Sequence, residues 1–225
     1  MNGRAILDSM RAKAAPIWEK EFAHPFVQGI GDGSLAPERF KFYLRQDYIF
    51  LIDYCRVFGI AAAKARDAAM IAAFAKLLND TSTIEMQIHR DYCAQLGISA
   101  AELEATKPSM ITHAYTSHLL TVAYSAPIVG IVAALLPCQL GYAEIAARLV
   151  REGTTGAGSQ YAAWVEAYAS KRFTDLAEMM VEMFASLADE LSASQAGVVE
   201  ESFLASSRYE YLFWEMVWDQ SGWPI

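Results

Sequence analysis

Apolar residues recur at intervals of three and four positions along nearly the whole chain. This spacing places them on one face of an α-helix, and no run of alternating β-branched residues is long enough to predict a strand. The sequence therefore predicts an all-α fold. The expected helices cover residues 4–23, 37–64, 67–78, 81–96, 108–125, 127–151, 159–168, 172–192 and 194–220.

Cap and turn signals mark several boundaries of these helices. Pro16 is expected to bend or divide the first helix, because proline removes a backbone donor. A turn is expected at residues 31–34, Ser194 is the expected cap of the last helix, and residues 152–158 form a Gly- and Thr-rich loop. The long helices, the short loops and the lack of an internal repeat predict a multi-helix bundle that forms one domain over residues 1–225.

Charge and cysteine content narrow the classes of partner. The formal net charge is −8, which removes the electrostatic basis for binding nucleic acid or an anionic membrane. The apolar segment 126–136 is shorter than the roughly 20 residues that span a bilayer, so we expect a helix buried on all sides. The N-terminus lacks the apolar stretch of a signal peptide. Three cysteines without a metal-ligand spacing fit a reducing cytoplasm.

A carboxylate and two rings share one face of the helix predicted at 37–64. Asp47, Phe50 and Tyr54 are spaced i, i+3 and i+7. A buried carboxylate beside rings can bind a flat ligand that carries an amine, since the rings stack on it. Spacing alone somewhat favours a core stripe with one solvated aspartate at its edge.

Two further candidates lie on other apolar helices. Cys138 and Tyr142 are four residues apart in a region almost without charge. A lone cysteine there is usually a small hydrophobe, and it becomes a nucleophile only if a neighbour stabilises its thiolate. Glu210 shares a face with Phe213 and Trp214, so we expect it to point inward with a raised pKa and to exchange protons near neutrality.

Tyrosines add a weaker signal for a pocket that binds a planar heterocycle. Tyr161, Trp164 and Tyr168 form another i, i+3, i+7 stripe, and Tyr115 lies in the charge-free region. Taken singly, each is a core ring with a polar tip.

Metal and haem sites find little support in the sequence. Glu85 and His89 are four residues apart, whereas di-iron bundles use paired Glu-x-x-His motifs. His24 precedes a proline, where a histidine is more often a helix cap or a packing residue than a haem ligand.

Taken in order, these pieces resemble the TenA family of thiaminase II enzymes, an all-helical family with a haem-oxygenase-like fold. The resemblance runs nearly end to end. It is carried by the segments 22–27, 33–35, 46–48, 137–142, 161–168 and 209–214, together with Phe40, Tyr43, Leu44, Glu85, His89 and Tyr115.

The resemblance implies a role for each candidate. Cys138 would be the nucleophile that adds to a pyrimidine ring, and Glu210 would protonate the ring nitrogen and later handle the proton of water. The resemblance implies that Asp47 holds the amino group of the pyrimidine and that Phe50 and Tyr115 stack on its ring. It also implies that Tyr142 and Tyr168 form hydrogen bonds around the cysteine and the glutamate. Family members often have Tyr at the position of Phe50, and Tyr161 is the alternative to Tyr168.

The implied activity is hydrolysis of thiamine or of an aminomethyl aminopyrimidine to hydroxymethyl aminopyrimidine, for thiamine salvage. No metal or organic cofactor is implied, and the expected assembly is a cytoplasmic homotetramer. Two alternatives stay open at this point: a protein that binds a pyrimidine without turnover, and a haem or redox protein on the same helical architecture.

Overall fold

In the computed structural model, every regular element of the described residues, 2–153 and 159–224, is a helix. This confirms the all-α prediction. The elements are α1 (Gly3–Phe22), α2 (Pro25–Asp32), α3 (Pro37–Lys64), α4 (Ala68–Asp80), the π-helix η1 (Thr81–Glu85), α5 (Met86–Gln95), α6 (Ala100–Ala105), α7 (Met110–Ser125), α8 (Ile128–Glu152), α9 (Ala162–Ala169), α10 (Lys171–Ala188) and α11 (Ala193–Asp219).

The helices form two compact units. The first comprises Met1–Ala36 and Val132–Trp214, and the second comprises Pro37–Ile131 and Glu215–Ile225. A single domain over residues 1–225 stays a prediction.

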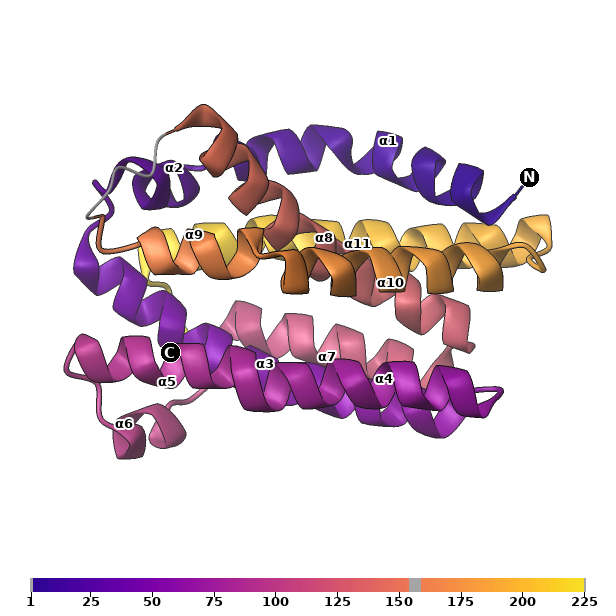
Figure 1. Ribbon diagram of the computed structural model, residues 1–225, viewed down its shortest axis with the longest axis horizontal. Coiled ribbons are helices and arrows are strands. Elements are labelled where there is room, and N and C mark those ends of the chain that lie inside the picture. Colours follow the sequence, from indigo (N-terminus) through magenta and orange to yellow (C-terminus); the bar gives the residue numbers. More distant parts are fainter. Residues whose placement is uncertain (1, 154–158, 225) are drawn as a thin grey trace. The chain divides into compact units, whose positions relative to one another are not determined.

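In the first unit, α1 lies beside α10, and α9 packs on α10 (Figure 1). The face of α1 that is buried follows a heptad-like spacing of 3, 4, 4 and 3 residues: Leu7, Met10, Ala14, Trp18 and Glu21. Four of these five side chains are apolar, as the interior of a bundle requires. Glu21 is the exception, an acid in a position that the pattern reserves for the core.

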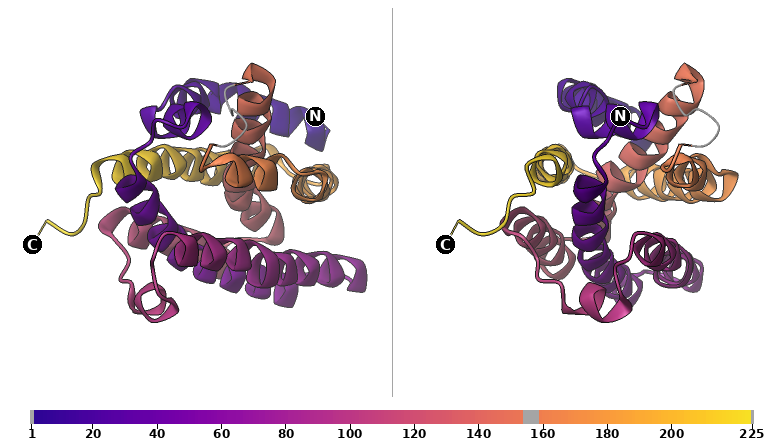
Figure 2. Two further views of the ribbon diagram at one scale, coloured as in Figure 1. Left: turned by 60° about the vertical axis from the view of Figure 1, so that its left-hand side comes forward. Right: turned by 90° about the vertical axis from the view of Figure 1, so that its left-hand side faces the viewer.

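In the second unit, α3 lies between neighbours that follow its length. Both α4 and α7 pack along it (Figures 1 and 2). Lys64, in the last turn of α3, donates from Nζ to the carbonyl oxygens of Ala123, Tyr124 and Ala126 at 2.7, 2.8 and 3.0 Å. These carbonyls lie at the end of α7, where a cation satisfies orphan acceptors and the helix dipole. One side chain thus ties the ends of two helices together.

The structure corrects several predicted boundaries. Helix α1 continues through Pro16, which is exposed, so water can reach the carbonyl that loses its donor. The last helix is capped by Ser192 rather than Ser194: Ser192 Oγ accepts from the Gln195 N–H at 3.4 Å, and Gln195 Oε1 accepts from the Ser192 N–H at 3.0 Å. This is the reciprocal capping box, in which a serine and the glutamine three residues later satisfy each other's backbone donors.

Two short helices, α2 and α6, were not predicted. Of the turn expected at 31–34, Gly31 and Asp32 are the last residues of α2, and Gly33 ends this helix in the left-handed conformation with φ 80°. Of the predicted loop at 152–158, Glu152 is the last residue of α8 and residues 154–158 lie outside the described residues.

Helix α8 is the only described helix long and apolar enough to cross a membrane by length and composition. However, 89% of its most apolar window is buried inside the protein. The prediction of a helix buried in the core is therefore confirmed.

Candidate active site

Asp47 is the centre of a buried polar group in the second unit. It is 3% exposed, so it is not a solvated residue at the edge of a core stripe. Its Oδ2 accepts a hydrogen bond from the Tyr43 hydroxyl at 3.1 Å and lies 2.5 Å from Nε2 of His89. Tyr43 stands one turn before Asp47 on α3, whereas His89 comes from α5. The sequence pattern missed this pairing across helices.

The geometry of His89 indicates an imidazolium. Its Nδ1 lies 3.0 Å from the Glu85 carbonyl oxygen, which can only accept, and its Nε2 faces the Asp47 carboxylate. Burial opposes the charge on His89, but the hydrogen bond and charge of Asp47, with the Glu85 carbonyl, together raise its pKa above the usual value. Glu85 ends the π-helix η1, so this local irregularity presents the carbonyl that orients the ring.

We expect the Asp47–His89 pair to make stability depend on pH. Because the folded protein holds the His89 proton more tightly than the unfolded chain, whose histidine pKa is about 6.5, the contribution is fully present below that pH. It is lost as pH rises through the higher folded pKa. His89→Gln should therefore lower the free energy of unfolding by about 1–3 kcal/mol below pH 6.5 and by less at higher pH. Urea unfolding of both proteins across pH 5–9 measures this, and a difference independent of pH would contradict it.

Two predicted stacking residues meet in the same unit. The ring centroids of Phe50 and Tyr115 are 5.0 Å apart, and those of Phe50 and Tyr54 are 5.4 Å apart. All three rings are buried. Phe50 follows Asp47 by three residues on α3, so the carboxylate and the aromatic surface lie on neighbouring positions of one helix face.

In the first unit, rings from two other helices gather around Tyr142 of α8. Its ring centroid lies 4.9 Å from that of Tyr168 on α9, 5.9 Å from that of Trp164, and 5.4 Å from that of Trp214 on α11. Tyr142 and Tyr168, predicted to act together, are therefore in contact. Tyr161 differs, since its hydroxyl donates to the Leu35 carbonyl oxygen at 2.6 Å.

Cys138 and Glu210 each stand one helical turn from this ring cluster. Cys138 is four residues before Tyr142 on α8, and Glu210 is four residues before Trp214 on α11. Cys138 is half-buried, and Glu210 is 4% exposed, as its position on the apolar face predicts.

The other two cysteines are held as thiols. Burial raises the pKa of both Cys55 and Cys93 to about 11. A thiolate is the reactive form, so neither is suited to attack at neutral pH.

Glu21 of α1 is a buried acid that the motif analysis missed. It is 1% exposed, and its Oε1 has no hydrogen-bond partner among the described residues. Burial, followed by repulsion from Glu210 and then Glu144, raises the pKa of Glu21 well above its usual range. The only signal in the sequence was its place on the apolar stripe of α1.

The remaining candidates hold structural positions. His24 caps α2, its Nδ1 accepting from the Phe26 N–H at 3.1 Å, as the cap interpretation predicts. Within residues 2–153 and 159–224, no three His, Cys, Asp or Glu side chains converge as metal ligands would.

The fold and these residues define a class of all-helical proteins with a haem-oxygenase-like architecture. Haem oxygenase-1 from the cyanobacterium Synechocystis sp. PCC6803 shares the fold with a TM-score of 0.66 at 15% identity, over 98% of this chain and 94% of that one. A likeness at that identity shows the fold alone.

Sequence comparison then gives the family. The model of the TENA/THI-4/PQQC family matches residues 11–220, and the chain belongs to this family. An "Aminopyrimidine aminohydrolase" of Halalkalibacterium halodurans is 43% identical over 96% of each chain, and another of Bacillus subtilis is 36% identical over 96% of this chain and 91% of that one. The structure of a TenA homologue from P. horikoshii OT3 has a TM-score of 0.87 at 30% identity, over 95% of this chain and 98% of that one.

Proposed function

We propose that the protein is an aminopyrimidine aminohydrolase of the thiaminase II type. The likeness over nearly the full length to relatives that bear this name carries the proposal. The substrate class is an aminopyrimidine with a substituent on its methylene group, such as thiamine or aminomethyl aminopyrimidine. The product is hydroxymethyl aminopyrimidine, which serves thiamine salvage.

Cys138 is the nucleophile in this proposal. Its thiolate forms a bond to a ring carbon while the ring π electrons move to a ring nitrogen, which takes the proton of Glu210. The rearranged ring expels the substituent from the methylene carbon with the electron pair of the broken bond, as neutral thiazole from thiamine or as ammonia from a protonated aminomethyl group, and water then adds there. Glu210 takes the proton of that water, the Cys138 thiolate leaves as the aromatic ring re-forms, and the ring nitrogen releases its proton to solvent. Cys138 is favoured over Cys55 and Cys93 because their raised pKa values keep them protonated.

The other residues bind and orient the pyrimidine. Asp47 accepts hydrogen bonds from its amino group, and the contact of Asp47 Oδ2 with His89 Nε2 holds this carboxyl group in place. Phe50 and Tyr115 supply the stacking surface; the phenyl ring of Phe50 retains that surface where relatives often carry tyrosine.

Tyr142 and Tyr168 orient the cysteine and the glutamate. The two rings are in contact one turn from Cys138. Tyr168 is preferred to Tyr161 because the Tyr161 hydroxyl is bonded to the Leu35 backbone.

A product assay tests the proposed function. The purified protein is incubated with thiamine, aminomethyl aminopyrimidine and its formylated derivative, and hydroxymethyl aminopyrimidine is measured by mass spectrometry. We expect product from at least one of them, and the highest kcat/KM identifies the preferred substrate. Calorimetric binding without product from any of the three would instead establish a binding protein without turnover.

We also propose that the protein works as a cytoplasmic homotetramer. Large apolar side chains remain exposed on several helices, as a surface that meets other copies requires. They include Ile71, Tyr124, Val150 and Val198. Sedimentation of the purified protein tests the assembly, and a monomer at all concentrations would rule it out.

A further inference from the structure

Glu21 lies at a buried position of α1, where a carboxyl group destabilises the folded protein. Such a residue is expected only where it serves a function. A buried polar atom without a hydrogen bond destabilises the fold, and Glu21 Oε1 is such an atom among the described residues. A leucine or methionine at this position of the α1 stripe would continue the apolar core. Packing of the core therefore does not explain why a glutamate stands at this position.

The surroundings of Glu21 connect it to the turn that carries Cys138. The other carboxyl oxygen, Oε2, lies 3.9 Å from the point where a side chain at Gly141 would begin. Gly141 is three residues after Cys138 on α8, so it is one turn along the same helix face. The absence of a side chain at this turn leaves the α8 backbone open toward Glu21.

Glu21 also interacts electrostatically with Glu210 of α11 and with Glu144 of α8. Glu144 is balanced by the guanidinium of Arg11, with which it forms an ion pair at a partly exposed site. Glu210 is buried, as Glu21 is. Glu21 and Glu210 are therefore two buried acids whose negative charges repel each other.

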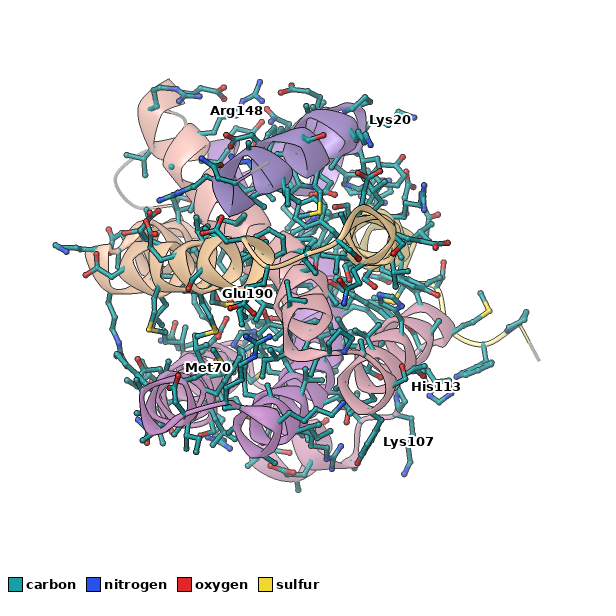
Figure 3. The ribbon with its side chains drawn as sticks, turned by 90° about the vertical axis from the view of Figure 1, so that its right-hand side faces the viewer. Lys20, Met70, Lys107, His113, Arg148 and Glu190 are labelled. Atoms are coloured by element: carbon teal, nitrogen blue, oxygen red, sulfur yellow. The ribbon has the colours of Figure 1, made fainter. Side chains whose placement is uncertain are left out.

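Cations on the adjoining helices are engaged with other groups. Arg148 of α8 donates to Glu19 at 3.3 Å and to Glu152 at 2.9 Å, and Nζ of Lys20 lies 6.0 Å from the centroid of the Tyr211 ring; Arg148 and Lys20 are labelled in Figure 3. His24 of α2 uses Nδ1 as an acceptor, so that nitrogen carries no proton. Within the described residues of this unit, no cation forms an ion pair with Glu21.

We propose that Glu21 is a positioning residue that shares one proton with Glu210 across neutral pH. Two like charges in a desolvated site cannot both form without a large penalty, so the pair keeps a proton that an isolated carboxyl group would lose. Glu210 gives this proton to the substrate ring nitrogen and regains one from the attacking water, while Glu21 fixes the pH range in which the proton is available. This role rests on the proposed function of Glu210 as acid and base.

The pH dependence of kcat/KM tests the proposal. In Glu21→Gln, a neutral side chain of the same shape removes the second charge, so Glu210 no longer titrates against a charge at position 21. The fall of kcat/KM on the alkaline side should move to lower pH by about one unit, which is about tenfold less activity at a given alkaline pH. Below that limb, kcat/KM should stay within about threefold of wild type.

Matched variants separate this role from a structural one. Glu21→Asp retains a carboxyl group and should keep the alkaline limb near its wild-type position. Glu19→Gln changes an exposed acid on the same helix and should leave the whole profile unchanged. A folded Glu21→Gln protein whose kcat/KM changes equally at every pH would overturn the proposal.

A titration that needs no turnover distinguishes failure of this proposal from failure of the proposed function. Carbon-13 NMR of the glutamate carboxyl groups in the wild-type protein, with Glu210→Gln and Glu21→Asp used for assignment, follows both residues. We expect each of the two signals to respond in two steps, as coupled groups do. Independent single-step titrations would overturn the shared proton even if the enzyme hydrolyses aminopyrimidines. If the protein forms no product but both signals titrate in two steps, the coupling of Glu21 and Glu210 is supported and the proposed hydrolase function is rejected.

Discussion

Replacing Cys138 with serine should lower kcat for aminopyrimidine hydrolysis by at least about a thousandfold. The thiolate is the attacking species in the proposed reaction, and a serine hydroxyl at the same position stays protonated at every pH the protein tolerates. Because the change exchanges one atom on a half-buried side chain, the fold and substrate binding should persist. Product formation under single-turnover conditions and circular dichroism measure the two effects.

A second cysteine provides the matched control. Cys55 is also half-buried, and burial raises the pKa of its thiol to about 11. Cys55→Ser should therefore leave kcat close to the wild-type value. Undiminished hydrolysis by Cys138→Ser would refute the assignment of the nucleophile while leaving the reaction class intact.

The sequence predicted the long helices well because each carries a continuous apolar stripe. The prediction for residues 37–64 matches α3 at both ends, where Pro37 suits a first turn and the apolar stripe stops near Lys64. The helices α2 and α6 span 8 and 6 residues, which is too short for a three-to-four periodicity to stand out. Their start signals are local, and only the structure shows His24 and Ser99 capping them.

Residue spacing predicted contacts within one helix but not contacts between helices; the family resemblance, not the spacing, grouped Phe50 with Tyr115 and Tyr142 with Tyr168. The i, i+3 relation of Asp47 and Phe50 follows from helix geometry, and both side chains are buried. The partner of Asp47 is His89, 42 residues away, and no periodicity encodes that distance. Folding brings the two together because α3 and α5 pack on each other.

Glu21 shows what a motif search overlooks. Motifs single out residues by type, and Glu21 carries no local signature. Its position continues the buried spacing of α1 through Trp18. Glu21 is an acidic residue at a position where the helix otherwise buries apolar side chains. Residues that break the local pattern in this way are found most often at functional sites.

Replacing Glu210 with glutamine should lower kcat by roughly 10²–10⁴-fold. The amide keeps the shape of the buried side chain beside the Trp214 turn but can neither give a proton to the ring nitrogen nor take one from water. KM should change less than kcat, because protonation assists the reacting ring rather than its binding. The alkaline limb that the Glu21–Glu210 pair sets should also disappear, since the titrating acid is gone.

The control for this variant lies on the same helix. Glu201 is exposed on α11, and Glu201→Gln should retain wild-type kcat. Reaction of Cys138 with iodoacetamide checks that the Glu210→Gln protein still presents its thiol. A Glu210→Gln enzyme that is folded, alkylated normally and within tenfold of the wild-type kcat would show that the proton comes from another group. Glu21, as the other buried acid beside α8, would then be the first residue to test in the role of the acid itself.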